Sequence, residues 1–328
     1  MKSRKEAIHF CLKKQPMIPT TDQVSVFAPA NLAMIKYWGK RNIALNLPMT
    51  SSLSLSLKDK GTFITLAPKS EPGLSLKIND KIIASDNKIF KRLNDYLSDF
   101  PFYPKLGLNI ESHSNIPIGA GLASSSSAFA AIVKGLNDLF SWHLNEKMLS
   151  ILARLGSGSA ARSFWDGFVI WHQGEDPDGM DSFAEPLAEK WDALKIGLLI
   201  LEHAEKPIGS TEAMIRTTQT SKLYKSWPQK VTHDLETIQK AIQEKDFLEF
   251  GKIAEENALF MHQTMADAVP QISYATEKTH ETISKIYQLR KEGLNVFFTQ
   301  DAGPNIKLIY LEKDVCEIKK QFEKCIII

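Results

Sequence analysis

The hydrophobic pattern of the chain changes near residue 190, and this change limits most strongly the folds open to it. Before it, short segments alternate apolar and polar residues, the period expected of half-buried strands, at 23–28, 52–57, 62–67, 74–78, 106–112 and 167–172. After a nearly continuous apolar run at 194–202 come long stretches with helical spacing at 232–246, 247–267 and 273–293, then two strand-like runs at 295–298 and 306–311. The pattern predicts an α+β protein of two layered domains divided near residue 190.

The length of the chain agrees with two domains. A chain of 328 residues exceeds the size at which one hydrophobic core usually keeps growing. We expect an N-terminal extension over residues 1–20, an N-terminal domain over 21–190 and a C-terminal domain over 191–328. The extension is a poor signal peptide, because its apolar patch "AIHFCL" is short and is followed by two lysines, so we expect an arm or a short helix.

Charge and cysteine content narrow the classes of function. The 40 lysines and arginines against 38 aspartates and glutamates give a net charge of +2, which argues against a broad surface for nucleic acid or anionic membrane but permits a local basic pocket. The 3 cysteines form no C-x-x-C pair, so we expect a reducing, cytoplasmic setting. No apolar run approaches the roughly 18–20 residues that span a bilayer, so we expect no membrane partner.

The segment "NIPIGAGLASSSSAFAAIV" (115–133) is the strongest local chemical signal. Gly119 and Gly121 allow close backbone approach, and Ser124–Ser127 begin a helix whose free N–H groups suit an anion. The segment lacks the lysine of a Walker loop, and Ser124 stands where a third glycine would complete G-x-G-x-x-G. It predicts a phosphate site. The alternative is a flexible loop with a serine N-cap.

Two other short segments carry charged groups in unusual settings. "IKYWGK" (35–40) places Lys36 and Lys40 four residues apart around two aromatic residues, which favours a multiply charged anion; the alternative is solvated lysines beside core aromatics. "TQDAGPN" (299–305) places Asp301 just before a Gly-Pro turn between two strands. By itself, Asp301 is read as a turn residue that bonds its own backbone.

These segments together resemble a known family. P-x-G-x-G-L-x-S-S-S at 117–126 resembles the phosphate loop of the GHMP kinases. A-P-x-N-x-A-x-x-K-Y-W-G-K-R, starting at 28, is more similar to the diphosphomevalonate decarboxylase family of that superfamily. Further resemblances follow in order, in "RLGSGSAARSFWDGFVIW" (154–171), in "GSTEAM" (209–214) as a substrate-side turn, in "NALFMHQTMADAVPQISY" (257–274) and in "TQDAGPN".

The resemblance implies a fold and a reaction. The fold would be the two-domain GHMP kinase-like fold, with an N-terminal domain like ribosomal protein S5 domain 2 and a ferredoxin-like α/β sandwich as C-terminal domain. The reaction would be the ATP-dependent decarboxylation of (R)-5-diphosphomevalonate to isopentenyl diphosphate, ADP, phosphate and CO2, a step of isoprenoid and sterol biosynthesis through the mevalonate pathway. The family also suggests a homodimer.

The resemblance further implies roles for particular residues. Asp301 would orient and deprotonate the tertiary hydroxyl during phosphoryl transfer, because that alcohol is a poor nucleophile. Lys36 would keep Asp301 ionised. Arg162 would grip the substrate carboxylate through its planar fork, and Asn31 would hold Arg162 in place.

Binding residues are implied in the same way. The substrate would contact residues of four segments: Tyr37, Trp38, Gly39, Lys40, Lys81, Ser157, Gly158, Ser159, Arg162, Ser210 and Thr211. ATP would contact the glycine-rich segment and the residues before it: Ser112, Asn115, Pro117, Gly119, Ala120, Gly121, Leu122, Ala123, Ser124 and Ser125. Mg2+ would be held by the ATP phosphates and water, with Ser125 the candidate protein ligand.

One departure from the family pattern keeps other functions open. The family often supplies an arginine to the diphosphate from an N-G-R-like turn, where "INDKII" (78–83) has Lys81, which keeps the charge but loses the bidentate fork. A decarboxylase of 5-phosphomevalonate, or a kinase of that or another small alcohol, therefore remains an alternative. A member of the superfamily that binds metabolites without catalysis is an alternative of another class.

Overall fold

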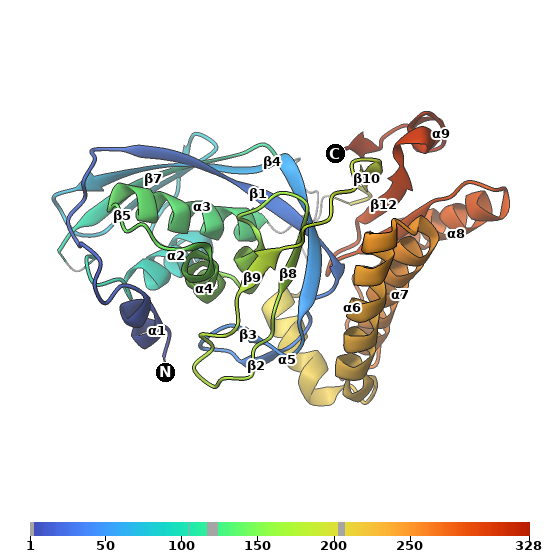
Figure 1. The fold of residues 1–328 in the computed structure, drawn as a ribbon, viewed down its shortest axis with the longest axis horizontal. Helices are drawn as coiled ribbons and strands as arrows, with labels where there is room; N and C mark the ends of the chain where they lie inside the picture. The colour runs from blue at the N-terminus through green and yellow to red at the C-terminus, as the bar shows by residue number, and fades with distance from the viewer. Residues whose placement is uncertain (1–2, 104, 117–123, 203–206) are drawn as a thin grey trace.

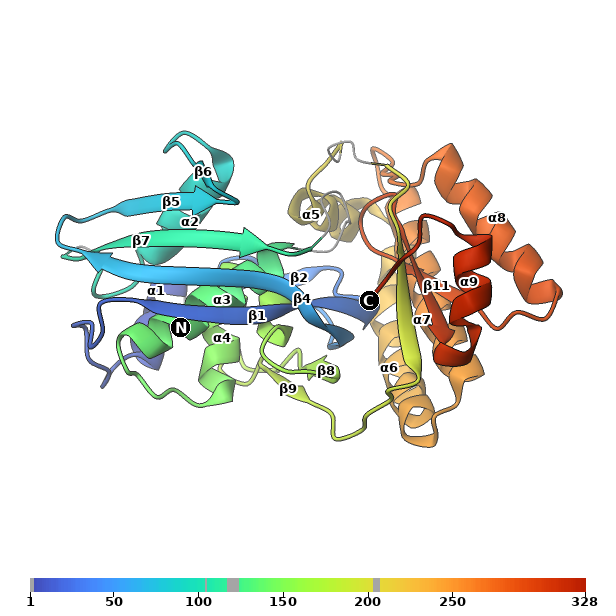
Figure 2. The same ribbon diagram turned by 90° about the horizontal axis from the view of Figure 1, so that it is seen from above.

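The computed structural model describes residues 3–103, 105–116, 124–202 and 207–328. The chain forms two parts that lie side by side, one built around a seven-stranded sheet and one around a four-stranded sheet (Figures 1 and 2). The elements of the first part are β1 (Val24–Ile35), β2 (Lys40–Asn42), β3 (Leu47–Pro48), β4 (Ser52–Lys69), β5 (Leu74–Ile78), β6 (Lys81–Ile82), β7 (Gly107–Ser114), β8 (Phe168–Trp171) and β9 (Ala184–Pro186), with helices α1 (Arg4–Cys11), α2 (Lys88–Leu97), α3 (Ser124–Leu139), α4 (Glu146–Gly156) and the 3-10 helix η1 (Gly158–Arg162).

A single long strand organises the first sheet. The strand order is β6-β5-β7-β4-β8-β9, with β1 paired to the other edge of β4 and β2-β3 forming a separate hairpin. The separate strands predicted at 52–57 and 62–67 are wrong: both belong to β4, because β1 pairs with it on either side of residues 58–60. Gly61 permits this pairing, since a Cβ there would lie 2.1 Å from the Ala28 carbonyl oxygen.

Helices α1–α4 cover one face of this sheet and bury its apolar side chains (Figure 1). The N-terminal segment contributes a short helix, α1, whose Ala7 and Ile8 are fully buried in the same core. Arg4 joins α1 to α2 and the turn after it, through ion pairs with Asp95 of α2 and with Asp99. The sequence reading identified α3 but gave no prediction for α2 or α4.

The second part alternates between sheet and helix. Its elements are β10 (Leu194–Leu199), β11 (Phe297–Gln300), β12 (Ile306–Leu311) and β13 (Ile326–Ile327), with α5 (Ser210–Thr220), η2 (Leu223–Ser226), α6 (Trp227–Glu244), α7 (Phe247–Ala266), α8 (Glu277–Lys291), η3 (Glu312–Asp314) and α9 (Val315–Gln321). The sheet is antiparallel in the order β11-β12-β10-β13. Consecutive residues Phe297 and Phe298 belong to different clusters, one with α6 and α7 and the other with α8 and α9, so helices cover both faces.

The two parts share an apolar core. One buried cluster contains Leu32 and Phe168 of the first part together with Trp227 and Phe250 of the second. Phe168 and Phe250 meet edge to face with ring centroids 5.8 Å apart. The end of β1 contacts α7, so the segment "IKYWGK" begins where the two parts meet.

Candidate active site

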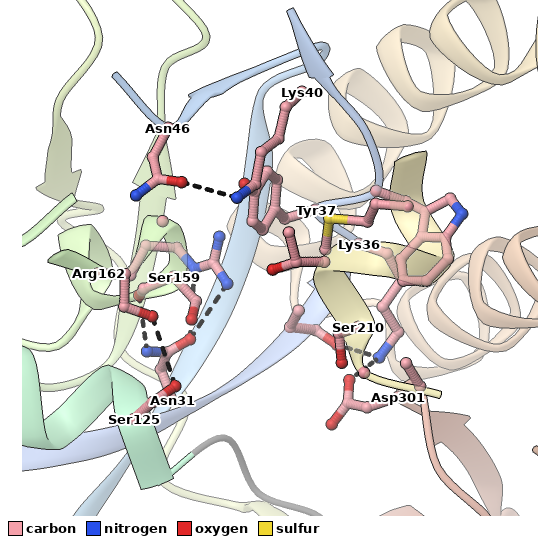
Figure 3. A pocket seen from close by; sticks show the side chains of 18 of the residues that line it. Asn31, Lys36, Tyr37, Lys40, Asn46, Ser125, Ser159, Arg162, Ser210 and Asp301 are labelled. Atoms are coloured by element: carbon pink, nitrogen blue, oxygen red, sulfur yellow. Dashed lines mark hydrogen bonds and ion pairs between the residues drawn. The ribbon is translucent and has the colours of Figure 1, made fainter. Parts of the chain in front are cut away.

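A cavity of about 550 Å³ lies between the two parts and is lined by residues from seven segments. This volume falls in the range of small-molecule sites, roughly 300–1,000 Å³. Figure 3 shows its labelled side chains pointing toward one another from both parts of the chain. The lining residues are Asn31, Ala33, Lys36, Tyr37, Trp38, Lys40, Asn46, Arg92, Ser124, Ser125, Ser157, Gly158, Ser159, Arg162, Gly209, Ser210, Thr211, Met214, Met261, Asp301 and Ala302.

Asp301 lies in the β11–β12 loop and is held by two ammonium groups. Lys36 Nζ lies 2.8 Å from Oδ1, and Lys307 Nζ lies 3.3 Å from Oδ2. The two lysine side chains are 2% and 1% exposed, whereas that of Asp301 is 28% exposed. Each cation therefore fixes one carboxylate oxygen from within the protein, while the carboxylate itself faces the cavity.

Contacts across the two parts position Lys36. Its backbone N–H donates to Asn257 Oδ1 of α7 at 2.8 Å, and its Nζ donates to the Ala33 carbonyl at 2.8 Å. Asn257 in turn donates to Asp234 of α6. Helices of the second part thus fix a lysine that belongs to the first.

The charges around Asp301 determine its protonation state. Burial by itself would raise the pKa of Asp301, but Lys36 and Lys307 outweigh it and hold the pKa well below its usual range. Burial, with Lys36 next in importance, lowers the pKa of His262 to about 4, so its ring is neutral at pH 7. His262 Nε2 is 3.2 Å from the Asp301 carbonyl oxygen, which a neutral ring reaches as an N–H donor. The carboxylate is ionised and can accept a hydrogen bond from a hydroxyl.

Arg162 occupies the opposite wall, with its guanidinium fixed by two side chains. Its Nε and Nη2 donate to Asn31 Oδ1 at 3.3 and 3.2 Å, and its Nη1 donates to Ser52 Oγ at 2.6 Å. Asn31 is held by its own donation to Ser163 Oγ. Burial lowers the pKa of Arg162 to about 10, which leaves it charged at neutral pH. The predicted Asn31–Arg162 contact is present, and no carboxylate neutralises Arg162 directly within the described residues.

Two aromatic residues that line the cavity near Lys40 carry hydrogen-bond donors without a partner in the described part of the chain. The Tyr37 hydroxyl and the Trp38 indole N–H are buried and have no partner among the described residues. Lys40 Nζ donates to Asn46 Oδ1 at 2.7 Å, and burial, followed by the charge of Arg92, lowers its pKa to about 8. Gly158 leaves room for Tyr37, since a Cβ there would lie 2.8 Å from the Tyr37 oxygen. Such free donors suit phosphate oxygens.

The segment "GSTEAM" is the start of a helix, so the predicted turn is wrong. Gly209 is the N-cap of α5, and Ser210 and Thr211 form its first turn on the cavity wall. Because glycine has no side chain to cap the helix, the first N–H groups stay available for an anion. Gly39, also expected at the substrate, is absent from the wall and packs against Tyr224.

The residues expected at ATP divide into three groups. Ser124 and Ser125 begin α3 and line the cavity, and Ser125 Oγ lies 3.4 Å from Ser157 Oγ. Ser112 and Asn115 do not line it, and the Asn115 amide instead bonds the backbone of Asp59 and Gly61. The expected residues Pro117, Gly119, Ala120, Gly121, Leu122 and Ala123 lie outside the described residues.

The side chains that line the cavity can hold Mg2+ only together with phosphate groups. Among the residues that the structure describes, no group of three His, Cys, Asp or Glu side chains could hold a metal ion. Mg2+ usually keeps several waters and binds through substrate phosphates, so the helix start at Ser124 and Ser125 is compatible with it.

Three basic residues do not have the places at the cavity that the sequence predicted. Lys81 lies on the exposed β6 strand and is not on the cavity wall. Arg92 of α2 lines the wall, and Lys307 contacts Asp301, yet neither was among the predicted residues. Lys307 could have been suspected, because a lysine in the apolar strand "IKLIYL" needs a buried partner. Nothing in the sequence indicated that Arg92 lies at the site, because the helix that contains it was not predicted.

Comparison with known proteins gives the same assignment for both parts of the chain. The model of the diphosphomevalonate decarboxylase-like N-terminal domain matches residues 28–184, and that of the mevalonate 5-diphosphate decarboxylase C-terminal domain matches residues 196–328. A diphosphomevalonate decarboxylase of Aspergillus fumigatus is 36% identical over 90% of this chain and 78% of its own length. That of Saccharomyces cerevisiae is 35% identical over 90% of this chain and 79% of its own length.

Solved structures agree with these relatives. Mevalonate diphosphate decarboxylase from Staphylococcus aureus superimposes with a TM-score of 0.87 at 31% identity, covering 93% of this chain and 95% of that chain. A structure described as MDDEF in complex with MVAPP, AMPPCP and magnesium superimposes with a TM-score of 0.85 at 34% identity, with the same coverage. The fold is thus the two-domain GHMP kinase-like fold, and the chain belongs to the diphosphomevalonate decarboxylase family.

Proposed function

We propose that this chain catalyses the ATP-dependent decarboxylation of (R)-5-diphosphomevalonate to isopentenyl diphosphate, with release of ADP, phosphate and CO2. The observation that carries the proposal is the arrangement of Asp301 and Arg162 in one cavity. An ionised carboxylate held by two lysines faces a buried arginine that no carboxylate neutralises directly within the described residues. The substrate supplies a hydroxyl for the first and a carboxylate for the second.

The reaction proceeds in two stages. Asp301 accepts the hydrogen bond, and finally the proton, of the 3-hydroxyl while that oxygen takes the terminal phosphoryl group of ATP and ADP departs. The C3–O bond then breaks with loss of phosphate, and the electrons of the C1–C2 bond form the new alkene as CO2 leaves. Arg162, which Asn31 holds in place, keeps the substrate carboxylate in line for this loss.

The diphosphate and ATP bind at the remaining walls. Tyr37, Lys40 and the N-terminus of α5 bind the diphosphate, since all three line the cavity and carry hydrogen-bond donors. Ser124 and Ser125, at the start of α3, bind ATP phosphates. Mg2+ bound to those phosphates supplies charge neutralisation for phosphoryl transfer.

The deciding experiment incubates the purified protein with ATP, Mg2+ and either 5-phosphomevalonate or 5-diphosphomevalonate, following ADP, phosphate and CO2. We expect equimolar ADP, phosphate and CO2 from the diphosphate. ADP without CO2 would indicate a kinase, and stoichiometric CO2 from the monophosphate alone would indicate the other decarboxylase. No turnover with either substrate would indicate a binding protein.

The variant Asp301→Asn tests the assigned catalytic residue. We expect it to bind ATP and substrate but to lose a factor on the order of 10² or more in kcat, because the acceptor of the hydroxyl proton is gone. Its Tm should also fall, because Lys36 and Lys307 keep their buried charges without a counter-charge. Near-normal kcat would refute the role of Asp301.

We further propose that residues 21–190 and 191–328 form the two domains, that the protein works in the cytoplasm and that it forms a homodimer. The three cysteines, which are unpaired in the structure, support a reducing compartment. No helix within the described ranges combines the length and the apolar character needed to cross a bilayer. Fluorescence imaging of a tagged chain tests the compartment, and sedimentation of the purified protein tests the dimer.

A further inference from the structure

Asp234 is a buried carboxylate outside the cavity to which the proposed reaction assigns no role. It lies on α6, and its side chain is 1% exposed. Its Oδ1 is 2.9 Å from the Nζ of Lys230, one turn earlier on the same helix, and its Oδ2 accepts a hydrogen bond from Asn257 Nδ2 of α7 at 2.8 Å. A buried charged pair often contributes little to stability, so Asp234 calls for an explanation other than packing.

Asn257 connects Asp234 to the backbone of Lys36. β1 ends at Ile35, and the backbone N–H of the next residue, Lys36, donates to Asn257 Oδ1 at 2.8 Å instead of to a neighbouring strand. The side chain of Lys36 places its Nζ 2.8 Å from Asp301 Oδ1 (Figure 3). Helices α6 and α7, which lie side by side in Figure 1, thus reach the proposed catalytic carboxylate through contacts that begin at Asp234.

The carboxylate of Asp234 decides which way the Asn257 amide faces. An amide can turn over, which exchanges its oxygen and its NH2 group. The Lys36 backbone N–H only donates and the carboxylate only accepts, so both are satisfied in one orientation alone, with the amide oxygen toward Lys36. In the other orientation, NH2 would face N–H and oxygen would face carboxylate. Asn257 is 0% exposed, so bulk water cannot replace either bond.

We propose that Asp234 is a positioning residue for the reaction: it orients the Asn257 amide, which holds the backbone of Lys36 so that its ammonium group reaches the proposed catalytic carboxylate. The inference rests on the proposed function, in which that carboxylate takes the hydroxyl proton of the substrate. A carboxylate on a helix of the second part, with no place on the cavity wall, thereby controls a lysine that follows a strand of the first part.

The test disturbs the direction of these hydrogen bonds and then restores it. In Asp234→Asn, the Lys230 ammonium favours the new amide oxygen, so the new NH2 group faces Asn257 and turns its amide over. In the double variant Asp234→Asn/Asn257→Asp, the amide and the carboxylate exchange places. The carboxylate at position 257 then accepts from the Lys36 N–H and from the amide at position 234, so every group has a partner again.

Steady-state kinetics with ATP, Mg2+ and 5-diphosphomevalonate measure kcat and KM. Asp234→Asn should lose a factor of about 10–100 in kcat, because a displacement of about 1 Å from the reacting geometry has an effect of this size. KM should change less than about threefold, because Lys40 is held separately by Asn46. The double variant should recover kcat to within about threefold of the wild type. The matched control Glu244→Gln should equal the wild type, since Glu244 pairs with Lys240 at the same spacing on the same helix but is exposed.

Hydrogen exchange gives a second readout, which does not depend on activity. Deuterium uptake by a peptide that includes Lys36 should rise in Asp234→Asn, because the Lys36 amide loses its acceptor. It should return to the wild-type level in the double variant and stay at that level in Glu244→Gln.

The outcomes separate this inference from the proposed function. A wild type that does not turn over 5-diphosphomevalonate refutes the proposed function and the catalytic part of the inference with it. An active wild type with unchanged kcat or unchanged deuterium uptake in Asp234→Asn overturns the inference alone. A double variant as impaired as Asp234→Asn also overturns it, because Asp234 would then act through the stability of α6. If Asp234→Asn does not fold, a folded double variant with wild-type kcat supports the inference, and an inactive one overturns it.

Discussion

Asp301 shows how the neighbours of a single residue set its chemistry. A carboxylate that two ammonium groups hold ionised is a weak base but a well-oriented hydrogen-bond acceptor. Phosphoryl transfer through a loose transition state needs positioning more than early removal of the proton. The surroundings of Asp301 therefore favour orientation of the hydroxyl first, with the proton moving as the new phosphate ester forms.

Lys307 is expected to control the pH dependence of the reaction. The charged groups around Asp301 are Lys36 after β1, Lys307 on β12 and Arg162 on η1, and His262 of α7 is the other titratable neighbour. In Lys307→Met only Lys36 remains paired with the carboxylate, so the pKa of Asp301 rises. Under the proposed mechanism the ionised form is the active one, so activity is lost as the pH falls through that higher pKa. The acid limb of kcat/KM should move up by about one pH unit or more.

Two controls accompany this measurement. Lys313→Met removes an exposed lysine after the same strand and should leave the pH profile unchanged. His262→Asn removes the other group that titrates at acid pH and should leave an acid limb that still responds to Lys307→Met. A pH profile of Lys307→Met that coincides with the wild type would contradict the positioning role of Lys307.

At the scale of elements, the first turns of two helices supply backbone N–H groups that can bind an anion. The first turns of α3 and α5 come from different parts of the chain, and both lie on the cavity wall. A helix N-terminus combines unused N–H groups with the positive end of the helix dipole. These N–H groups add to the positive charge of the lysines and arginines that line the same cavity.

The β2–β3 segment is fixed to the second part through Gly39. This glycine has φ +102°, and a Cβ would lie 1.9 Å from the Tyr224 oxygen, which donates to the Trp38 carbonyl. Gly39→Ala should lower the free energy of unfolding by at least about 2 kcal/mol, from backbone strain plus the clash. It should also raise KM, because Trp38 and Lys40 flank this position.

The variant Tyr224→Phe separates the clash from the strain. It removes the oxygen nearest to the added Cβ, so Gly39→Ala should cost less in this background than in the wild type. Urea unfolding of the two single variants and the double variant measures this coupling. Strictly additive losses would show that backbone strain alone explains the effect.

The whole molecule is expected to unfold as one unit, because an apolar core runs through both parts. Phe250 is fully buried and contacts Phe168 and Trp191, with ring centroids 5.8 and 5.5 Å apart. Domains usually move relative to one another unless their interface is large and hydrophobic, as it is here. The two parts, which together form the walls of the cavity, are therefore expected to stay fixed relative to each other.

Phe250→Ala tests this continuity. We expect a loss of about 3–5 kcal/mol in the free energy of unfolding, as for other buried phenylalanines, with both parts still unfolding together. Far-UV circular dichroism and tryptophan fluorescence should then give coincident transitions at a lower Tm. Separate transitions, with only one shifted, would show that the parts are independently stable.

Local sequence patterns were sufficient to predict the helices and strands whose structure depends mainly on their own residues. Strands 74–78 and 306–311 were predicted with the bounds that β5 and β12 have. The helix ending before Gly293 was predicted from its periodicity, and Gly293 has the φ of +100° that favours glycine. The long β4 was missed because only its pairing with β1, at Ser56 and again at Gly61, joins the two predicted runs into one strand. Helix α2, rich in polar residues, was missed because its periodicity covers less than three turns.

The sequence by itself determined the candidate reactive groups: the motifs around Lys36, Arg162 and Asp301 predict the chemistry, because they place two cations and a carboxylate in segments that resemble those of one family. Only the tertiary structure decided which other cations act on them. Lys307 and Arg92 belong to no motif, and they became visible when β12 and α2 were placed beside the cavity. The physical reason is that electrostatic effects depend on distance and burial, which a position in the sequence does not specify.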